Sequence, residues 1–175
     1  MNDNLSPQDI AEKAKQTYQA RDYAAAADLF VQAQNAYAGA GDPLMAAEMQ
    51  NNQSVALLRG GNAQAALDAV QGTAGIFSEA ADLRRAGMAW ANEASALQAL
   101  KRSKEAIDCY KKAADALEKA GEGDLRVEVM QLLSMHYMRH FKFYEAILAL
   151  QSGLAGVKNP TPRQRLMKKI LFIRL

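Results

Sequence analysis

The chain has 175 residues, enough to bury a continuous core, and 50% of them are hydrophobic although only 7% are aromatic. Alanine fills 35 positions and proline only 4, a bias toward small, helix-forming side chains that argues against a sheet protein. No stretch of about 18 apolar residues is present and the first ten residues are polar, so we expect neither a transmembrane span nor a signal peptide, and a cytoplasmic protein.

The net charge of +2 is unevenly distributed along the chain. No acidic residue follows Glu145, whereas six lysines and arginines follow it, so residues 1–145 carry a net charge of −4. The basic character therefore belongs to the last thirty residues. A general affinity for nucleic acid is not indicated, because the body of the chain is mildly acidic.

Local signals predict a series of helices. Ser6, Pro7 and Asp9 form a helix start, with an N-cap serine, a proline in the first helical position and an acid in the third. The expected helices are 7–20, 23–38, 43–59, 63–80, 83–100, 104–120, 125–140 and 143–156, with a ninth after Pro160. At three corners, glycine is followed by a residue expected to cap the next helix, namely Asp42, Asn62 and Asp124.

A repeated pattern marks the second helix of each predicted hairpin. Alignment of these segments makes four alanines equivalent: Ala26, Ala65, Ala106 and Ala146. The spacings between them are 39, 41 and 40 residues. A period near 40 indicates helical hairpins that stack one on the next.

This pattern resembles the tetratricopeptide repeat (TPR) family, whose two-helix unit has small residues at positions 8, 20 and 27 and a large one at position 24. Counting back twelve residues from the alanines gives position 8: Ala14, Gln53, Ala94 and Ser134. Gln53 departs from the family pattern. A period of 40 is similar to that of the long-repeat branch, to which kinesin light chains belong, rather than to the common repeat of about 34 residues.

The resemblance implies an all-α fold, a right-handed α-solenoid of four hairpins. The expected TPR-like domain covers residues 1–156, with repeats at about 7–42, 43–82, 83–123 and 124–156. Residues 157–175 are expected to form a linker and a basic amphipathic helix that caps the solenoid.

The resemblance also implies a concave groove lined by the first helix of each hairpin. The residues assigned to this groove are Gln50, Asn51, Ser54, Leu57, Met88, Asn92, Ser95, Gln98, Gln131 and Met135. Asn51 and Asn92 are placed at the same repeat position. A carboxamide both donates and accepts hydrogen bonds, so the two could bind the backbone of an extended peptide. The alternative is that they cap or solvate a helix surface.

The expected function is therefore that of an adaptor that binds a peptide or protein segment, and the alternative is a self-assembly module that forms a homo-oligomer. We expect no enzyme activity, cofactor or metal site. His136 and His140 are spaced i, i+4, but no third ligand accompanies them, and Arg139 and Lys142 would disfavour a cation. Cys109 has no predicted base beside it.

The C-terminal segment begins with a predicted capping box, Thr161 to Gln164. The apolar residues of the helix that follows are expected to form one face: Leu166, Met167, Ile170, Leu171 and Ile173. Burial of such a side chain contributes about 1.5–3 kcal/mol of stability, which would be lost if the side chain stayed in water. We therefore expect this face to cover the last hairpin. The alternatives are self-association or partner binding and, less favoured, an anionic membrane surface.

Overall fold

The computed structural model describes residues 5–155, 157 and 159–171, and within them every regular element is an α-helix. The helices are α1 (Pro7–Gln19), α2 (Tyr23–Gly39), α3 (Pro43–Arg59), α4 (Ala63–Val70), α5 (Thr73–Glu79), α6 (Leu83–Ala99), α7 (Ser103–Lys119), α8 (Gly123–Arg139), α9 (Phe143–Ala155) and α10 (Pro162–Leu171). The predicted all-α fold is confirmed. None of the described helices is both long and apolar enough to cross a membrane.

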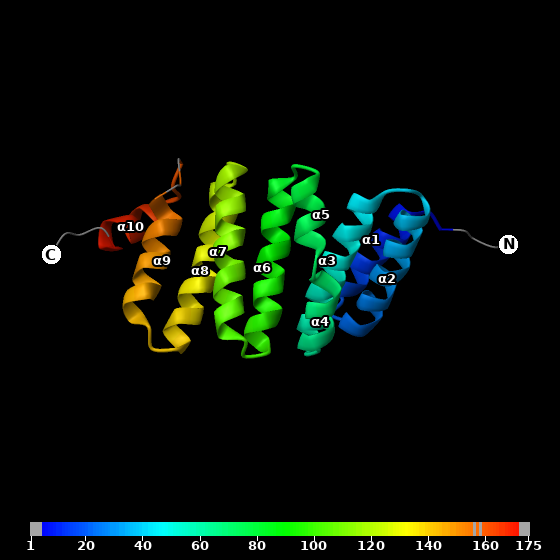
Figure 1. Cartoon of the computed structure of the whole chain (residues 1–175), viewed down its shortest axis with the longest axis horizontal. Helices are drawn as coiled ribbons and strands as arrows, with labels where there is room; N and C mark the ends of the chain where they lie inside the picture. Colours follow the sequence, from blue (N-terminus) through cyan, green and yellow to red (C-terminus); the bar gives the residue numbers. More distant parts are fainter. Residues whose placement is uncertain (1–4, 156, 158, 172–175) are drawn as a thin grey trace.

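The helices form a single elongated row, with α1 and α2 at one end and α10 at the other (Figure 1). Four hairpins follow one another: α1 with α2, α3 with α4 and α5, α6 with α7, and α8 with α9. The second helix of each hairpin also packs against the first helix of the next. The chain is therefore an α-solenoid, as predicted.

The corner between successive helices is built the same way throughout the row. A residue with a left-handed backbone stands at every twentieth position, with φ between 58° and 85°: Arg21, Gly41, Gly61, Ala81, Lys101, Gly121 and Phe141. The amide of the next residue returns to a carbonyl five positions earlier, as from Asp42 to Tyr37, which closes the preceding helix in a Schellman-type turn. The predicted Asp42 and Asn62 caps are confirmed. The structural period is thus 20 residues per helix and 40 per hairpin.

This regular period corrects the predicted alignment of the second hairpin by one residue. The equivalent alanines are Ala26, Ala66, Ala106 and Ala146, each 0% or 1% exposed. Ala65 is only half-buried. Counting from Ala66 places Ser54, rather than Gln53, at position 8, and the departure from the family pattern disappears. Ala65 and Ala66 are adjacent, so the sequence pattern fits either one at this repeat position. Only the packing shows that Ala66 occupies it.

The predicted helix at 63–80 is wrong, because the structure divides it into α4 and α5. Gly72 has a left-handed backbone with φ of 90°, a conformation that only glycine adopts readily and that cannot continue a helix. Thr73 Oγ1 at the start of α5 donates to the carbonyl of Val70 at the end of α4, which links the two helices across the break. Phe77 on α5 is fully buried beside Val70. The fourth hairpin also begins earlier than predicted, at Gly123, so Asp124 lies within the first turn and Glu122 is the N-cap.

Helix α10 covers only part of the final hairpin. Met167 and Leu171 pack against a small cluster formed by Val127, Leu154 and Val157, and the Gln151 amide donates to the Leu171 carbonyl. The predicted capping box is present, since the Thr161 and Gln164 side chains each accept from the other residue's backbone amide.

The prediction of one buried apolar face on this helix is only partly correct. Leu166 and Ile170 are 59% and 61% exposed, because α10 meets a narrow stripe near the end of α9. Ile173 lies outside the described residues.

Candidate functional site

The candidate site is the face shared by the first helices of the four hairpins. In the 40-residue register it consists of Glu12, Lys15 and Tyr18 on α1, Asn52, Val55 and Leu58 on α3, Asn92, Ser95 and Gln98 on α6, and Leu132, Met135 and Met138 on α8. Residues three and six positions apart lie on one side of a helix, so each helix contributes one row. We call these twelve residues the groove face.

The structure places the predicted groove residues of α6 and α8 at or beside this face. Asn92, Ser95, Gln98 and Gln131 are half-buried, whereas Met88 and Met135 are exposed. The apolar end is on α8, where Leu132, Met135 and Met138 are 36%, 50% and 48% exposed. The composition of the face therefore changes along the row, from polar on α6 to apolar on α8.

The predicted groove residues of α3 are displaced by the register correction. Ser54 is 1% exposed and so lies within the packed interior, and Leu57 packs against two core clusters. Gln50 is half-buried one position before the buried Asn51. Asn52 and Val55, which the sequence reasoning missed, take the places assigned to Asn51 and Ser54.

The two predicted asparagines are joined to each other. Asn92 Nδ2 on α6 donates to Asn51 Oδ1 on α3 over 2.9 Å, and Asn51 is 6% exposed. They are not equivalent residues: Asn52 is the repeat equivalent of Asn92, while Asn51 lies behind the face and orients the Asn92 carboxamide. Among the described residues Asn92 makes no other side-chain hydrogen bond, so its oxygen and second amide hydrogen remain available for a ligand.

A cavity lies at the N-terminal end of the groove face, between α1 and α3. It has a volume of about 250 Å³ and is lined by Lys15, Tyr18, Gln19, Phe30, Asn52 and Val55. Phe30 is 3% exposed and gives the cavity a buried aromatic wall. The polar side chains of its lining include the Asn52 and Gln19 carboxamides and the Lys15 ammonium. The cavity can take an apolar side chain while a carboxamide contacts the backbone that bears it.

A chain of polar side chains that begins at Gln98 of the groove face connects the third and fourth hairpins. Gln98 Oε1 lies 3.1 Å from His136 Nδ1 and 3.4 Å from the Tyr110 hydroxyl, and Ser103 Oγ lies 3.0 Å from His136 Nε2 and 2.9 Å from His140 Nε2. A carbonyl oxygen only accepts, so His136 donates from Nδ1 and, when neutral, accepts the Ser103 hydroxyl proton at Nε2. His140 then donates to Ser103.

The buried position of His136 affects its pKa. It is 2% exposed, and this burial lowers its pKa below the usual 6.5, with the positive charges of His140, Arg139 and Lys142 acting in the same direction. His136 is thus a neutral residue at the boundary between hairpins. The described residues contain no group of three His, Cys, Asp or Glu side chains placed to hold a metal ion.

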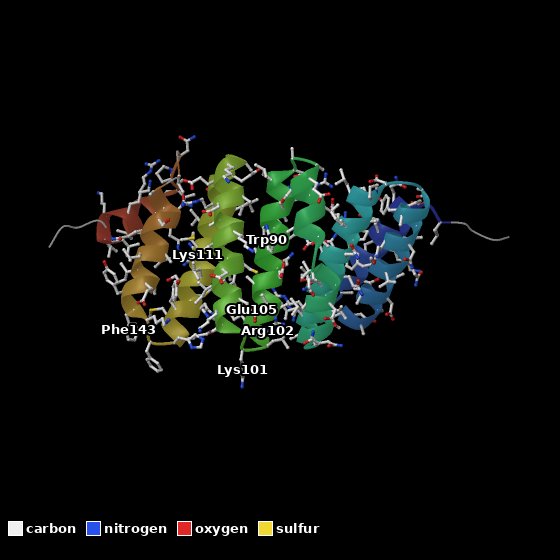
Figure 2. All side chains as sticks on the ribbon, viewed as in Figure 1. Trp90, Lys101, Arg102, Glu105, Lys111 and Phe143 are labelled. Atoms are coloured by element: carbon white, nitrogen blue, oxygen red, sulfur yellow. The ribbon has the colours of Figure 1, made fainter. Side chains whose placement is uncertain are left out.

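A second cavity, with a polar lining and a volume of about 300 Å³, lies between α4 and α7 with α6 beneath it. It is lined by Leu67, Gln71, Trp90, Glu93, Leu97, Arg102, Glu105, Asp108, Cys109 and Lys112. Three of its charged groups have close partners: Arg102 binds Glu105 at 2.6 Å, and Lys112 Nζ lies 4.5 Å from the centre of the Trp90 ring. Figure 2 labels Trp90, Arg102 and Glu105. Burial, and next the Glu93 charge, raise the pKa of Cys109 to about 11, so its thiol stays protonated and is a poor nucleophile.

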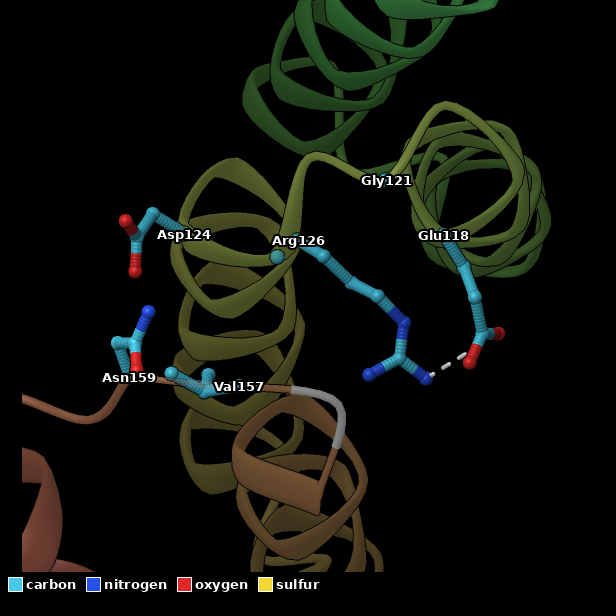
Figure 3. Close-up of a pocket in the computed structure, with 7 residues that line it drawn as sticks. Glu118, Gly121, Asp124, Arg126, Val157 and Asn159 are labelled. Atoms are coloured by element: carbon cyan, nitrogen blue, oxygen red, sulfur yellow. Dashed lines mark ion pairs between the residues drawn. The ribbon is translucent and has the colours of Figure 1, made fainter.

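A third cavity, of about 390 Å³, surrounds a buried arginine that the sequence reasoning did not single out. It is lined by Glu118, Gly121, Gly123, Asp124, Arg126, Val157 and Asn159 (Figure 3). Arg126 is 8% exposed and donates to the carbonyls of Ser152 and Gly153 near the end of α9, while its Nη2 lies 3.6 Å from Glu118 on α7. Arginine at the carbonyl end of a helix is stabilising, so we assign Arg126 to holding α7, α8 and α9 together.

Comparison with known proteins defines the class of fold. No protein-family model and no curated protein matches the sequence. Among solved structures, two crystal structures of the nearly identical TPR-like repeats of a Podosopora anserina putative kinesin light chain, one of them a single-residue variant, superpose with a TM-score of 0.74. Sequence identity is 17%, and the matches cover 95% and 96% of this chain and 85% of the other. The chain thus has the fold of TPR-like repeat proteins.

Proposed function

We propose that this protein is an adaptor whose groove face binds an extended segment of another protein. The observation that carries the proposal is the Asn92 carboxamide, held in place by Asn51 with one donor and one acceptor unused. A peptide backbone presents an N–H and a C=O to such a group regardless of its side chains. Asn52, at the equivalent position on α3, supplies a second carboxamide.

The flanking regions of the groove face support side-chain recognition on both sides of these asparagines. On one side is the apolar cavity with Tyr18, Phe30 and Val55. On the other side the α8 residues Met135 and Met138 form an exposed, adaptable apolar surface. We therefore infer a ligand whose apolar residues flank a central stretch that is bound through its backbone.

The test begins with peptides selected from a random phage-displayed library on the immobilised full chain, and their affinity is measured by calorimetry. The double variant Asn52→Ala with Asn92→Ala is expected to weaken binding by about 1–3 kcal/mol, because two carboxamides to the backbone are lost. Asn35→Ala, an exposed asparagine on α2, is the matched control. Selected peptides that bind the double variant as tightly as the parent protein would contradict the proposal.

The alternative function, self-assembly through the same surfaces, is tested on the same samples. Light scattering over a concentration series should give a monomer mass if the groove face is free for a ligand. A stable oligomer that the selected peptides dissociate would instead identify the groove face as a contact between copies of the chain.

A further inference from the structure

The two ends of the solenoid differ in character. At the N-terminal end, the exposed side chains of α1 are polar, among them Asp9, Glu12, Lys13 and Gln16. At the other end, α9 and the corner before it expose five large apolar side chains: Phe141 at 81%, Phe143 at 53%, Tyr144 at 71%, Ile147 at 45% and Leu148 at 43%. The polar face of α1 is a poor complement to this surface, so head-to-tail stacking of two copies is disfavoured.

The repeat register shows what such a surface does elsewhere in the molecule. On α7, Ser103, Ile107, Tyr110 and Ala114 form a row against which the next hairpin packs, with Ser103 bonded to His136 of α8 and Tyr110 and Ala114 buried. Forty residues later, the same row on α9 is Phe143, Ile147, Leu150 and Leu154. The α9 row therefore has the same spacing as the α7 row, against which the first helix of the next hairpin packs.

Helix α10 covers only the Leu154 end of this row. It packs against Leu154 and reaches Gln151, near the end of α9, and Figure 1 shows it beside that end only. Phe143 lies at the opposite end of α9, pointing away from the solenoid (Figure 2). The Phe141 and Phe143 rings meet edge to face with centroids 6.2 Å apart, so they support each other as one apolar wall. The exposed row therefore begins with an aromatic wall and continues over Ile147.

The charges near this surface identify the partner that suits it. Arg139, His140 and Lys142 lie at the Phe141 end, and the exposed Arg163, Arg165 and Lys169 lie on α10. One exposed acidic residue, Glu145, lies on α9 itself, and no acidic residue follows it in the sequence. Two copies meeting through this surface would bring like charges together, whereas acidic groups on a different partner would be attracted.

We propose that the α9 row is a docking site for a helix of another protein, with an apolar face bordered by aspartate or glutamate. The apolar face of this helix lies on Phe143 and Ile147, where the first helix of a further repeat would pack. Its acidic residues face Arg139 and Lys142 at the Phe143 end of the row and the basic side chains of α10 at the Leu154 end. This site is separate from the groove face and does not depend on the function proposed for it.

The test uses a fluorescein-labelled model helix and the full chain. The probe has about 18 residues, enough for measurable helicity, with leucines at i, i+4, i+7 and i+11, glutamates on both borders and alanine elsewhere. A second probe carries lysine in place of each glutamate. Fluorescence anisotropy is expected to show binding of the glutamate probe that weakens at high salt and is at least about tenfold tighter than that of the lysine probe.

Two test variants, each with a matched control, locate the binding. Ile147→Asp should weaken the glutamate probe about tenfold or more, whereas Ile76→Asp, which changes an isoleucine 39% exposed on α5, should not. Arg139→Glu with Lys142→Glu should reduce the preference for the glutamate probe, while the same number of reversals at Lys13 on α1 and Arg21 in the corner after it should leave it unchanged. Asn92→Ala should have no effect, which separates this site from the groove face.

Three outcomes would overturn the proposal. The first is equal binding of the two probes, or binding of neither at a protein concentration of about 100 μM. The second is a dimer in light scattering that Ile147→Asp converts to monomer, since the row is then an interface between copies. The third is Ile147-dependent sedimentation with vesicles of anionic lipid without probe binding, which would assign the surface to a membrane.

Discussion

Gly87 on α6 lies directly against Leu117 on α7: a β-carbon added to Gly87 would lie 2.6 Å from Leu117 Cγ. Leu117 is 1% exposed, so it has little room to move aside. We expect Gly87→Ala to lower the free energy of unfolding by about 1–3 kcal/mol, although alanine is the better helix former. A urea titration measures this. Gly75→Ala on α5, where nothing lies within 4 Å, is the control and should be neutral or stabilising.

The corrected register of the second hairpin predicts different costs at adjacent alanines. Ala66 is 0% exposed at the equivalent of Ala106, so Ala66→Leu should destabilise the protein by about 1–3 kcal/mol through overpacking. Ala65 is half-buried, and Ala65→Leu should cost less. Denaturant midpoints compare the two variants. A larger loss of stability for Ala65→Leu would show that Ala65, as in the sequence-based alignment, occupies the repeat position.

The buried His136 predicts a loss of stability in acid. Its pKa in the folded protein is lowered, mainly by burial, so below about pH 6.5 the unfolded chain binds this proton more strongly than the folded chain. The contribution of the neutral ring is complete above pH 6.5 and declines as the pH falls, by at most about 1.4 kcal/mol per pH unit.

Unfolding free energies between pH 8 and pH 5.5 test this for the parent protein and for His136→Gln. The variant should be less stable at pH 8, since the bonds to Gln98 and Ser103 are altered, and should show a shallower decline toward pH 5.5. Parallel pH profiles for the two proteins would mean that another group is responsible.

The two sides of α10 should respond differently to polar substitution. Met167→Ser with Leu171→Ser removes the contacts with Leu154 and should lower the thermal midpoint. Leu166→Ser with Ile170→Ser changes two exposed side chains and should leave the midpoint nearly unchanged. Differential scanning calorimetry decides between them. Equal effects of the two double variants would show that α10 packs through a different face in solution.

The sequence by itself determined the helical class, most helix ends and the period near 40, because these depend on neighbouring residues. Proline and aspartate start helices, glycine ends them, and alanine fills close contacts, as at Pro43, Asp42 and Gly61.

Only the tertiary structure decided which residues meet across helices. Ala65 and Ala66 have the same local propensity, and only the packed neighbour selects Ala66 for the interior. The same one-residue shift moved Asn51 behind the groove face, where the hydrogen bond to Asn92 gives it a supporting role. The exposure of Ile147 likewise depends on how far α10 extends along α9. Contacts between distant segments follow from the packing of whole helices, which local propensity does not specify.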